Sequence, residues 1–400
     1  MRPKELPEGW EWIKLGEISE RIHYGYTASA ENKKVGPKLL RITDIQDNNV
    51  DWATVPYCPI SEKDLPNYLL KSGDLVFART GATVGKSFLI EGDIPESVFA
   101  SYLIRVILKK NVDPKFIYCF FQSPLYWNQI EQKKVGAGQE NVNSQKLAQI
   151  EIPLPPLPLQ RQIVAVLERA EAVKRQRHEA DALTGALLQS VFLKMFGDPE
   201  RNDREWAKVK LGDVSKVVVS YVGPINQFFC EKERGVPLLN TTNIKPNGLI
   251  SNDFRFVLRE FHKKNKKSQL HPGDIIVARH GKSGSATIIP DYLIEAQSIN
   301  NVIIKRSTKM EPDYIRYLLN LSIHSQKMLG LKTGTVQKII NTKQLADFKI
   351  PLPPLVLQQQ FARVVESVER IREQQVASGR HIEGLCEGLM QRAFGGELAV

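Results

Sequence analysis

The chain has 400 residues, of which 42% are hydrophobic and 25% are charged, and its formal net charge is +11. This length exceeds one typical domain and accommodates two hydrophobic cores with connecting elements. Because no uncharged apolar run reaches about 18 residues, the sequence argues against a membrane span.

The N-terminal segment and the cysteines indicate the cellular compartment. Residues 1–12 (MRPKELPEGWEW) have no apolar core and so do not resemble a signal peptide. The four cysteines show neither zinc-binding nor paired spacing: Cys58, Cys119, Cys230 and Cys386. We therefore expect a cytoplasmic protein with no metal site.

The positive charge is unevenly distributed along the chain. Residues 1–156 contain 19 basic and 19 acidic side chains, whereas residues 198–354 contain 25 basic and 15 acidic ones. A basic excess indicates a polyanionic partner such as nucleic acid. Net charge therefore supports nucleic-acid binding by the second block. The first block could bind only if its basic residues were sorted onto one face.

Four motifs occur twice in the same order. The pairs are WEWIKLGEI at 10–18 with WAKVKLGDV at 206–214, LLRITDI at 39–45 with LLNTTNI at 238–244, GDLVFAR at 73–79 with GDIIVAR at 273–279, and IPLPPL at 152–157 with IPLPPL at 350–355. The offset between partners varies only from 196 to 200 residues. Colinear matches at a nearly constant offset indicate a duplication.

Within each copy, short β-branched segments bounded by glycine and charge predict strands. They are LVFART at 75–80, FLIEG at 88–92, SYLIRVIL at 101–108, IIVARH at 275–280 and NVIIKR at 301–306. Residues 114–132 and 312–329 predict amphipathic helices. Because strands and helices intermingle without regular βαβ alternation, we expect each module to be α/β or α+β with a mixed sheet.

A long helix is predicted after each IPLPPL segment, whose three prolines exclude helix and favour a stiff, extended exit. The apolar residues that follow recur at spacings of 3 and 4, which is typical of a coiled-coil seam. They are Ile163, Val166, Ala170, Val173, Ala180, Leu187 and Val191 in the first helix, and Phe361, Val364, Val368, Ile371, Ile382, Leu385 and Leu389 in the second. At about forty residues each, the helices would be about 60 Å long, longer than a module is wide. Two ordinary core helices are the alternative.

Polar residues interrupt both seams near the middle, where they would fix the helix register: Arg177 and Thr184, then Gln375 and Ser378. The motifs divide the chain into a first module at 1–152, a first helical region at 153–197, a second module at 198–350 and a second helical region at 351–400. The fold is thus predicted to be two pseudo-repeated modules joined by two long helices.

No constellation of residues predicts catalysis. GATVGKS at 81–87 resembles a P-loop, but it has three residues between its glycines where that loop needs four, and the second copy lacks Gly-Lys-Ser. We interpret it as a glycine-rich turn whose backbone and nearby Thr80 and Lys86, and Lys282 in the second copy, can approach a phosphodiester. Both proline pairs lie between leucines, unlike the motif of methyltransferases that act on base amines. An enzyme with an unfamiliar site is the remaining alternative.

Arginines occupy equivalent loop positions after a predicted strand in each copy. Arg79 follows the first strand, and Arg279 with His280 follows the second. A guanidinium fork binds two acceptors at once, which suits phosphate and guanine. The alternative is a surface salt bridge to Asp74 or Asp274.

Further polar residues lie in equivalent loops. Groups suited to base edges are Arg41 and Thr43 in one copy and Asn240, Thr242 and Asn243 in the other. Capping by Thr43 and Asn243 is the structural alternative. Lys263 and Lys264, followed by Lys266 and Lys267, predict a phosphate-contacting loop, with a solvated charge run as the alternative.

The last equivalent loops precede short predicted helices. Asn143 or Ser144, and Asn341 or Thr342, are expected to cap those helices. The residues left to face a ligand are Gln139, Asn141, Gln337 and Lys338.

Taken together, these motifs resemble the specificity subunit of type I restriction–modification enzymes over the whole chain. The residues that carry the resemblance are LPEGWEWIKLGEI, LLRITDI, GDLVFARTGATVGK, and IPLPPLPLQRQIV with its partner IPLPPLVLQQQFA. The resemblance implies two target recognition domains, at 1–152 and 198–350. These alternate with a central and a C-terminal conserved helical region, at 153–197 and 351–400, that form an antiparallel coiled coil.

The same resemblance implies the partners. Each recognition domain would read half of a bipartite site on double-stranded DNA, and two modification subunits that bind S-adenosylmethionine would dock on the helical regions. Restriction subunits would join them, and the chain itself would have no catalytic residues and no cofactor. Since only the framework motifs match between the copies, the target is expected to be asymmetric. The alternative is a coiled-coil assembly scaffold whose modules bind proteins.

Overall fold

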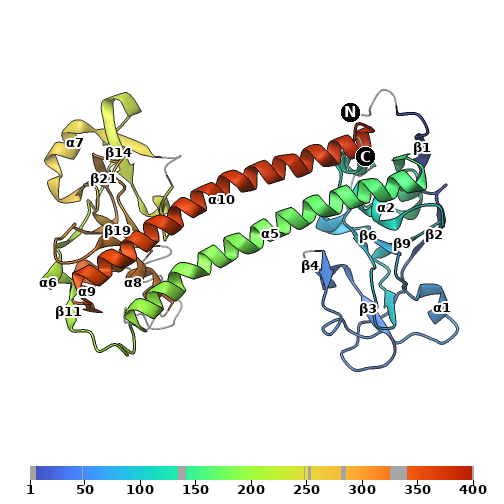
Figure 1. Ribbon diagram of the computed structural model, residues 1–400, viewed down its shortest axis with the longest axis horizontal. Helices are drawn as coiled ribbons and strands as arrows, with labels where there is room; N and C mark the ends of the chain where they lie inside the picture. Colours follow the sequence, from blue (N-terminus) through green and yellow to red (C-terminus); the bar gives the residue numbers. More distant parts are fainter. Residues whose placement is uncertain are drawn as a thin grey trace. The chain divides into compact units, whose positions relative to one another are not determined.

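The computed structural model describes residues 6–46, 48–133, 141–246, 248–250, 254–280, 285–324 and 340–398. The chain forms two compact units, Met1–His178 with Ala377–Val400 and Glu179–Val376 (Figure 1). Each unit therefore contains one module together with part of each long helix. In the part of the chain that the model describes, no helix is both long and apolar enough to cross a bilayer.

The first unit is built on an antiparallel four-stranded sheet with the order β2-β9-β6-β7. These strands are β2 (Ser19–Tyr24), β9 (Leu103–Leu108), β6 (Leu75–Ala78) and β7 (Ser87–Leu89). All four residues of β6 are buried because both faces of the sheet are covered. Leu75 and Phe77 belong to one apolar cluster, whereas Val76 and Ala78 belong to another. The alternation of a strand thus explains why its sequence is a continuous apolar run.

Shorter elements complete the first unit. The strands are β1 (Glu11–Lys14), antiparallel to β10 (Glu151–Leu154), β3 (Lys38–Leu40), parallel to β8 (Ser97–Phe99), and the pair β4 (Ile45–Gln46) and β5 (Asn49–Val50). The helices are α1 (Leu65–Tyr68), α2 (Pro114–Phe121), α3 (Pro124–Lys133) and α4 (Ser144–Ala148), with 3-10 turns η1 (Ile42–Asp44) and η2 (Gly81–Thr83).

The second unit repeats the four-stranded sheet as β12-β22-β19-β20. These strands are β12 (Val217–Val219), β22 (Asn301–Ile304), β19 (Ile275–Ala278) and β20 (Ala286–Ile288). In β19 the side chains again divide between two clusters, with Ile275 and Val277 in one and Ile276 and Ala278 in the other. The identical strand order confirms the duplication that the motifs predicted.

A five-stranded sheet, β13-β17-β14-β21-β18, is added in the second unit. Its strands are β13 (Phe229–Cys230), β17 (Arg255–Leu258), β14 (Gly235–Leu239), β21 (Ala296–Ser298) and β18 (Gln269–Leu270). The remaining elements are β11 (Lys208–Lys210) with β23 (Lys349–Pro351), β15 (Ile244–Lys245) with β16 (Gly248–Leu249), α6 (Leu211–Val214), α7 (Arg259–Lys264), α8 (Pro312–His324), α9 (Thr342–Ala346), and the 3-10 turns η3 (Asn226–Phe228), η4 (Lys232–Arg234), η5 (Thr241–Asn243) and η6 (Lys266–Ser268). Because β14 and β21 are parallel while their other neighbours are antiparallel, the sheet is mixed, as predicted.

The prediction of a single helix at 114–132 is wrong in one respect. It is two helices, α2 and α3, separated at Gln122 and Ser123. Gln122 ends α2, and the Ser123 hydroxyl accepts a hydrogen bond from the backbone N–H of Tyr126 in the first turn of α3. A serine followed by Pro124 favours a new helix start over continuation of the old helix.

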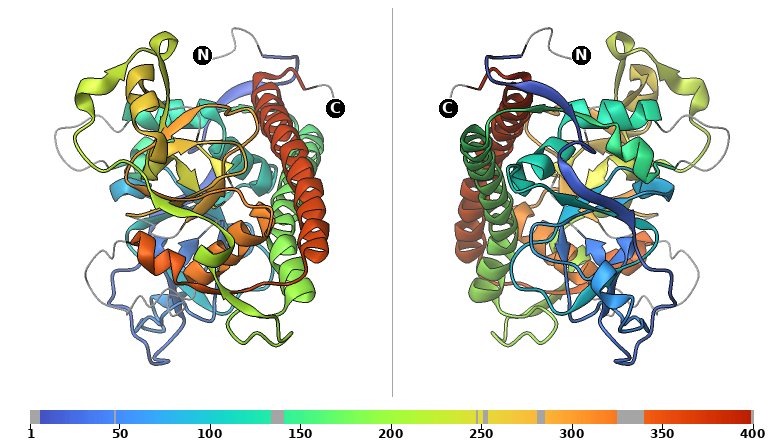
Figure 2. Two further views of the ribbon diagram at one scale, coloured as in Figure 1. Left: turned by 90° about the vertical axis from the view of Figure 1, so that its left-hand side faces the viewer. Right: turned by 90° about the vertical axis from the view of Figure 1, so that its right-hand side faces the viewer.

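Two long helices occupy the regions that follow the proline-rich segments. They are α5 (Leu157–Phe196) and α10 (Leu355–Gly395), drawn in green and red in Figure 2. In the first unit, Ile163 and Leu167 of α5 share an apolar cluster with Phe394 of α10. In the second unit, Phe192 of α5 shares a cluster with Phe361 of α10. The helices therefore take part in both hydrophobic cores.

The predicted seam is only partly correct. Four predicted seam residues are 45–66% exposed, namely Val173, Leu187, Ile371 and Leu385. The residues actually buried near the helix ends include Val164, Leu188 and Val365, which pack into the clusters of the modules. Each module packs against a broad face of the helix. A heptad pattern, which assigns two apolar positions in every seven residues, does not predict which residues that face contains.

The polar interruptions of the seam do meet in the second unit. Gln375 Nε2 donates a hydrogen bond of 2.9 Å to Thr184 Oγ1. A specific polar contact between two helices favours one register over its neighbours.

Candidate nucleic-acid interface

In the first module, Arg79 lies in a cluster of loops at the end of β6. Its backbone N–H donates to Tyr102 O at 3.2 Å, and its carbonyl accepts from the N–H of Val142 at 3.0 Å. The next residue, Thr80, forms an isolated bridge with Asn141. Two predicted contact residues, Arg79 and Asn141, are thereby placed in adjacent segments although they are far apart in the sequence.

The side chain of Arg79 is held by an aromatic ring. Its guanidinium carbon lies 4.7 Å from the centre of the Tyr24 ring. The Tyr24 hydroxyl accepts from the backbone N–H of Ser144 at 3.0 Å and from its hydroxyl at 3.3 Å. Burial raises the pKa of Tyr24, but the bonds from Ser144 and the charge of Arg79 outweigh it, so the net pKa is lowered. This stacking fixes the plane of the guanidinium.

The salt-bridge alternative for Arg79 is wrong. Asp74 instead forms an ion pair of 2.5 Å with Arg105, and both side chains are only 5% exposed. The Nε of Arg79 is buried and has no hydrogen-bond partner among the described residues. In the second module, Asp274 pairs with Lys305 at 2.8 Å. Arg79 thus has guanidinium donors that are not engaged by the neighbouring aspartate.

The turn η1 gives Arg41 a structural role. Its Nε and Nη2 donate to the two carboxylate oxygens of Asp44 at 3.0 and 2.6 Å, and its backbone N–H donates to the same carboxylate at 2.9 Å. Such a bidentate pair fixes the turn. Thr43, at the tip of the turn, is exposed.

The equivalent turn η5 in the second module uses amides in place of an ion pair. Asn240 Oδ1 accepts from the N–H of Thr242 at 2.8 Å, and Asn243 Oδ1 accepts from the N–H of Asn240 at 3.0 Å. Asn243 is only 3% exposed and also donates to Ile250 O. Its expected contact with a base is therefore corrected to the capping alternative, since its amide is buried and satisfied. Thr242 stays exposed beside it.

The glycine-rich segment is a turn between strands, as interpreted from the sequence. It connects β6 to the antiparallel β7, whereas a P-loop leads into a helix. Gly85 has a φ of +94°, and an added Cβ would lie 2.6 Å from the Trp127 ring, so only glycine fits there. Lys86, at the end of the turn, is exposed.

The remaining predicted residues of the second module are partly described. Lys263 and Lys264 are exposed in the last turn of α7, and His280 is exposed after β19. The carbonyl of Arg279 accepts from the N–H of Ile340 at 3.4 Å, as Arg79 does from Val142. Gln139, Lys282, Gln337 and Lys338 lie outside the described residues.

The helix caps follow the prediction. Asn143 Oδ1 accepts from the N–H of Lys146, and Asn341 Oδ1 accepts from the N–H of Gln344, each at 2.7 Å. These asparagines therefore hold the loops that carry Asn141 in one module and Ile340 in the other.

Three residues that lie in or support these loops were not anticipated. Tyr24 was not recognised because stacking on an arginine has no local sequence pattern. Tyr102 is 63% exposed and contacts Arg79 through its backbone. Asn301, fully buried, donates to Leu239 O and Ile299 O and accepts from the Thr241 hydroxyl. For Asn301, the sequence offered one indication of this role, namely an asparagine at the start of a strand of aliphatic residues.

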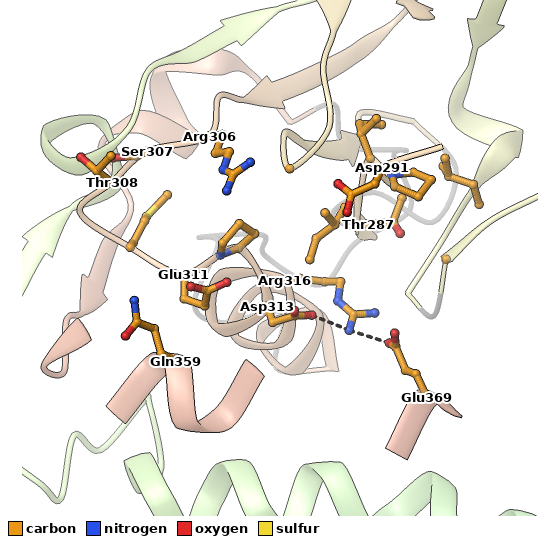
Figure 3. A pocket seen from close by; sticks show the side chains of 18 of the residues that line it. Thr287, Asp291, Arg306, Ser307, Thr308, Glu311, Asp313, Arg316, Gln359 and Glu369 are labelled. Carbon is orange, nitrogen blue, oxygen red and sulfur yellow. Dashed lines mark hydrogen bonds and ion pairs between the residues drawn. The ribbon is translucent and has the colours of Figure 1, made fainter. Parts of the chain in front are cut away.

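Two of the cavities in the described part of the chain lie outside these loops. One, of about 1010 Å³ in the second unit, is lined by Arg306, Glu311, Arg316 and Glu369 among others (Figure 3). Arg316 donates to both Asp313 and Glu369 at 2.8 Å. The other, of about 710 Å³ in the first unit, is lined by equivalent elements. None of the predicted DNA contacts that the structure describes lines either cavity, and the described residues contain no group of three or more side chains that could hold a metal ion.

The site is thus a set of polar turns presented by a repeated scaffold, with different side chains at equivalent positions. This arrangement is typical of a duplicated recognition protein, in which the framework is kept and the contacts vary. A family model confirms this class. The chain belongs to the family of type I restriction modification DNA specificity domains, whose model matches residues 7–180 and 203–377.

Similar proteins extend over the whole chain. It is 25% identical to the putative type I restriction enzyme MjaX specificity subunit of Methanocaldococcus jannaschii, over 99% of this chain and 95% of the relative. It is 24% identical to the type I restriction enzyme EcoKI specificity subunit of Escherichia coli, over 100% and 91% respectively. A chain solved in a study of complex assembly and conformational transition of the type I R-M system shares the fold, with a TM-score of 0.66, 21% identity and coverage of 99% and 100%. The resemblance seen in the motifs is confirmed, and the family's task is DNA target recognition.

Proposed function

We propose that each module reads one half of a bipartite, asymmetric target on double-stranded DNA. In this proposal the long helices form an antiparallel coiled coil that spaces the modules, and residues 1–152, 153–197, 198–350 and 351–400 are the four functional segments. The chain supplies recognition in the cytoplasm without catalysis or a cofactor of its own. Two modification subunits that bind S-adenosylmethionine, together with restriction subunits, supply the chemistry.

One observation supports the proposal that the two modules read two different half-sites. The two four-stranded sheets have the same strand order, yet the turns at their ends present different groups. The first module presents Arg79 stacked on Tyr24, and the second presents Thr242 and the exposed lysines of α7. A common scaffold with different donors and acceptors suits two half-sites of different sequence.

Exposed apolar side chains on the long helices support docking of partner subunits. In the second unit, Leu183 is 72% exposed, Val356 66% and Val376 57%. In the first unit, Leu385 is 66% exposed. Apolar side chains at solvent-facing positions of a helix are typical of surfaces that receive a partner helix.

Footprinting of the full chain together with its modification subunits tests this function. We expect two protected patches of a few base pairs, separated by unprotected sequence. One continuous patch, or no protection, would refute bipartite reading and favour the protein-binding scaffold. Methyl transfer from S-adenosylmethionine by the purified chain alone would contradict its non-catalytic role.

A further inference from the structure

A buried glutamine joins each module to the long helix that follows it. In the first unit, Gln160 lies in the first turn of α5 and is 1% exposed. Its Oε1 accepts from the backbone N–H of Asp113, just before α2, at 2.8 Å, and its Nε2 donates to Pro155 O at 2.8 Å. One side chain therefore connects the module helix α2, the proline-rich exit and α5.

The second unit contains the same joint. Gln358 in the first turn of α10 is 0% exposed. Its Oε1 accepts from the N–H of Glu311, just before α8, at 2.9 Å, and its Nε2 donates to Pro353 O at 2.7 Å. The contact has thus been kept in both copies, although residues around it differ.

Only a neutral amide of this length satisfies both partners. The N–H of Asp113 is partly buried and the carbonyl of Pro155 is buried, and a donor or acceptor shielded from water needs a partner. A glutamate could accept but not donate, and a lysine could donate but not accept. Two directional hydrogen bonds to one planar amide also restrict the angle between the helices, which the surrounding apolar contacts, such as those of Ile163, do not.

A small angular change at the start of a long helix has a large effect at its end. For a 40-residue helix such as α5, which at 1.5 Å per residue is about 60 Å long, a tilt of about 3° displaces the far end by about one base-pair rise. If the helices space two DNA-reading modules, the joint must be stiff for the gap between half-sites to be selected to a single base pair.

We infer that Gln160 and Gln358 are positioning residues that set the gap between the two half-sites, by fixing the direction of each long helix on its module. The inference rests on the proposed bipartite reading. It concerns the number of base pairs between half-sites, whereas the residues of the turns concern the bases read.

The test is selection of binding sites from random double-stranded DNA by the full chain with its modification subunits. Wild type is compared with Gln160→Met and Gln358→Met, which keep side-chain length and remove both hydrogen bonds. We expect both variants to select the same half-site bases as wild type. We expect their preference for the wild-type gap over gaps one base pair longer or shorter to fall about tenfold, the effect of losing one to two net hydrogen bonds.

Two matched controls separate positioning from loss of stability. Gln129 makes two hydrogen bonds of 2.8 Å between α3 and β10 inside the first module and one of 3.4 Å to Leu125 O within α3, so Gln129→Met removes at least as many bonds without touching the joint. Gln359, next to Gln358, is exposed, so Gln359→Met changes only the surface. Both controls should retain wild-type gap discrimination.

The outcomes distinguish this inference from the proposed function. If wild type selects no bipartite site, the proposed function fails. If wild type selects one and both joint variants keep its gap preference, or lose it no more than Gln129→Met, the positioning role is refuted while bipartite reading stands. Should a Met variant not fold, as judged by circular dichroism, Gln→Glu at the same position replaces it. That variant retains the acceptor, and unchanged gap preference in it would equally refute the inference.

Discussion

Arg79 and Arg41 carry the same charge in the first module but have different partners. Arg79 stacks on Tyr24 and its Nε has no partner among the described residues, whereas Arg41 donates through Nε and Nη2 to the carboxylate of Asp44. We expect Arg79→Ala to weaken binding of the cognate DNA by about 1–3 kcal/mol, as expected for loss of a guanidinium that reads a base. Fluorescence anisotropy with the cognate duplex and with a duplex altered in one half-site measures this.

Arg41→Ala is the matched control. It removes the ion pair that fixes η1, so its first effect should be on the thermal stability of the module, with cognate and altered duplexes weakened equally. If Arg79→Ala bound cognate DNA as tightly as wild type, Arg79 would be assigned to structure.

The histidine beside Tyr24 predicts a dependence of stability on pH. Burial, with the charges of Arg21 and Arg105, lowers the pKa of His23 from 6.5 to about 4. Between these values the unfolded state binds a proton that the folded state does not, so the free energy of unfolding should decrease as pH falls through this window. His23→Phe should flatten the dependence, since the ring already packs on Phe99 at 5.5 Å.

Urea unfolding at several pH values between about 7 and 4.5 measures this slope. His178→Gln, an exposed histidine at the end of the same unit, is the control and should keep the wild-type slope. An identical slope in wild type and His23→Phe would show that other groups cause the pH dependence.

Residues differ in how far the sequence could predict them. The caps Asn143 and Asn341 were predictable because an N-cap is a local rule with a fixed offset. The roles of Arg41 and Arg79 were not separable, since both follow strands and only the fold shows which carboxylate each can reach. Gln160 was missed because its partners, Asp113 and Pro155, lie on other elements.

At the scale of elements, each module helix is tied to a long helix by an ion pair of different burial. The Arg316 side chain is 5% exposed and pairs with Asp313 and Glu369 (Figure 3). Lys115 of α2 is 43% exposed and pairs with Glu168 of α5. Removing a buried charge leaves its partners uncompensated, whereas an exposed pair contributes little.

We therefore expect Arg316→Met to destabilise the second unit by about 3 kcal/mol, the lower end of the usual range because Glu369 is 44% exposed. Lys115→Met should cost less than about 1 kcal/mol in the first unit. Urea titrations followed by circular dichroism compare the two. Equal losses of unfolding free energy in the two variants would mean that burial does not determine the strength of these ion pairs.

Elements were predicted best where one period dominates. The strands β6 and β19 and the long helices α5 and α10 follow from apolar runs and from 3-and-4 spacing. The seam was assigned less well because the helix ends pack on modules, so that Val164 and Leu188 are buried and Val173 is not. The apolar pattern of one helix does not show which of its residues will be buried, because that depends on the shape of the module surface packed against it.

At the scale of the whole molecule, the duplication separates what is shared from what differs. The sheets, the proline exits and the glutamine joints are common to both units, whereas the net charge and the turns are not. If the shared parts determine the geometry and the divergent parts determine the DNA contacts, the divergent parts of one unit should be replaceable without changing the geometry. The sequence predicted this division because framework motifs repeat, but it could not predict which loops lie together, since Thr80 and Asn141 meet only in the fold.

Exchange of one module tests this independence directly. Replacing residues 21–150 with the equivalent segment of another family member keeps β1, β10, Gln160 and both long helices. We expect the chimera to select a new sequence at one half-site only, with the other half-site and the gap unchanged. The methylation pattern of DNA modified by the reconstituted complex reports all three. A chimera that changed both half-sites would show that the modules do not read DNA independently, because a change confined to one unit would then have altered the contacts made by the other.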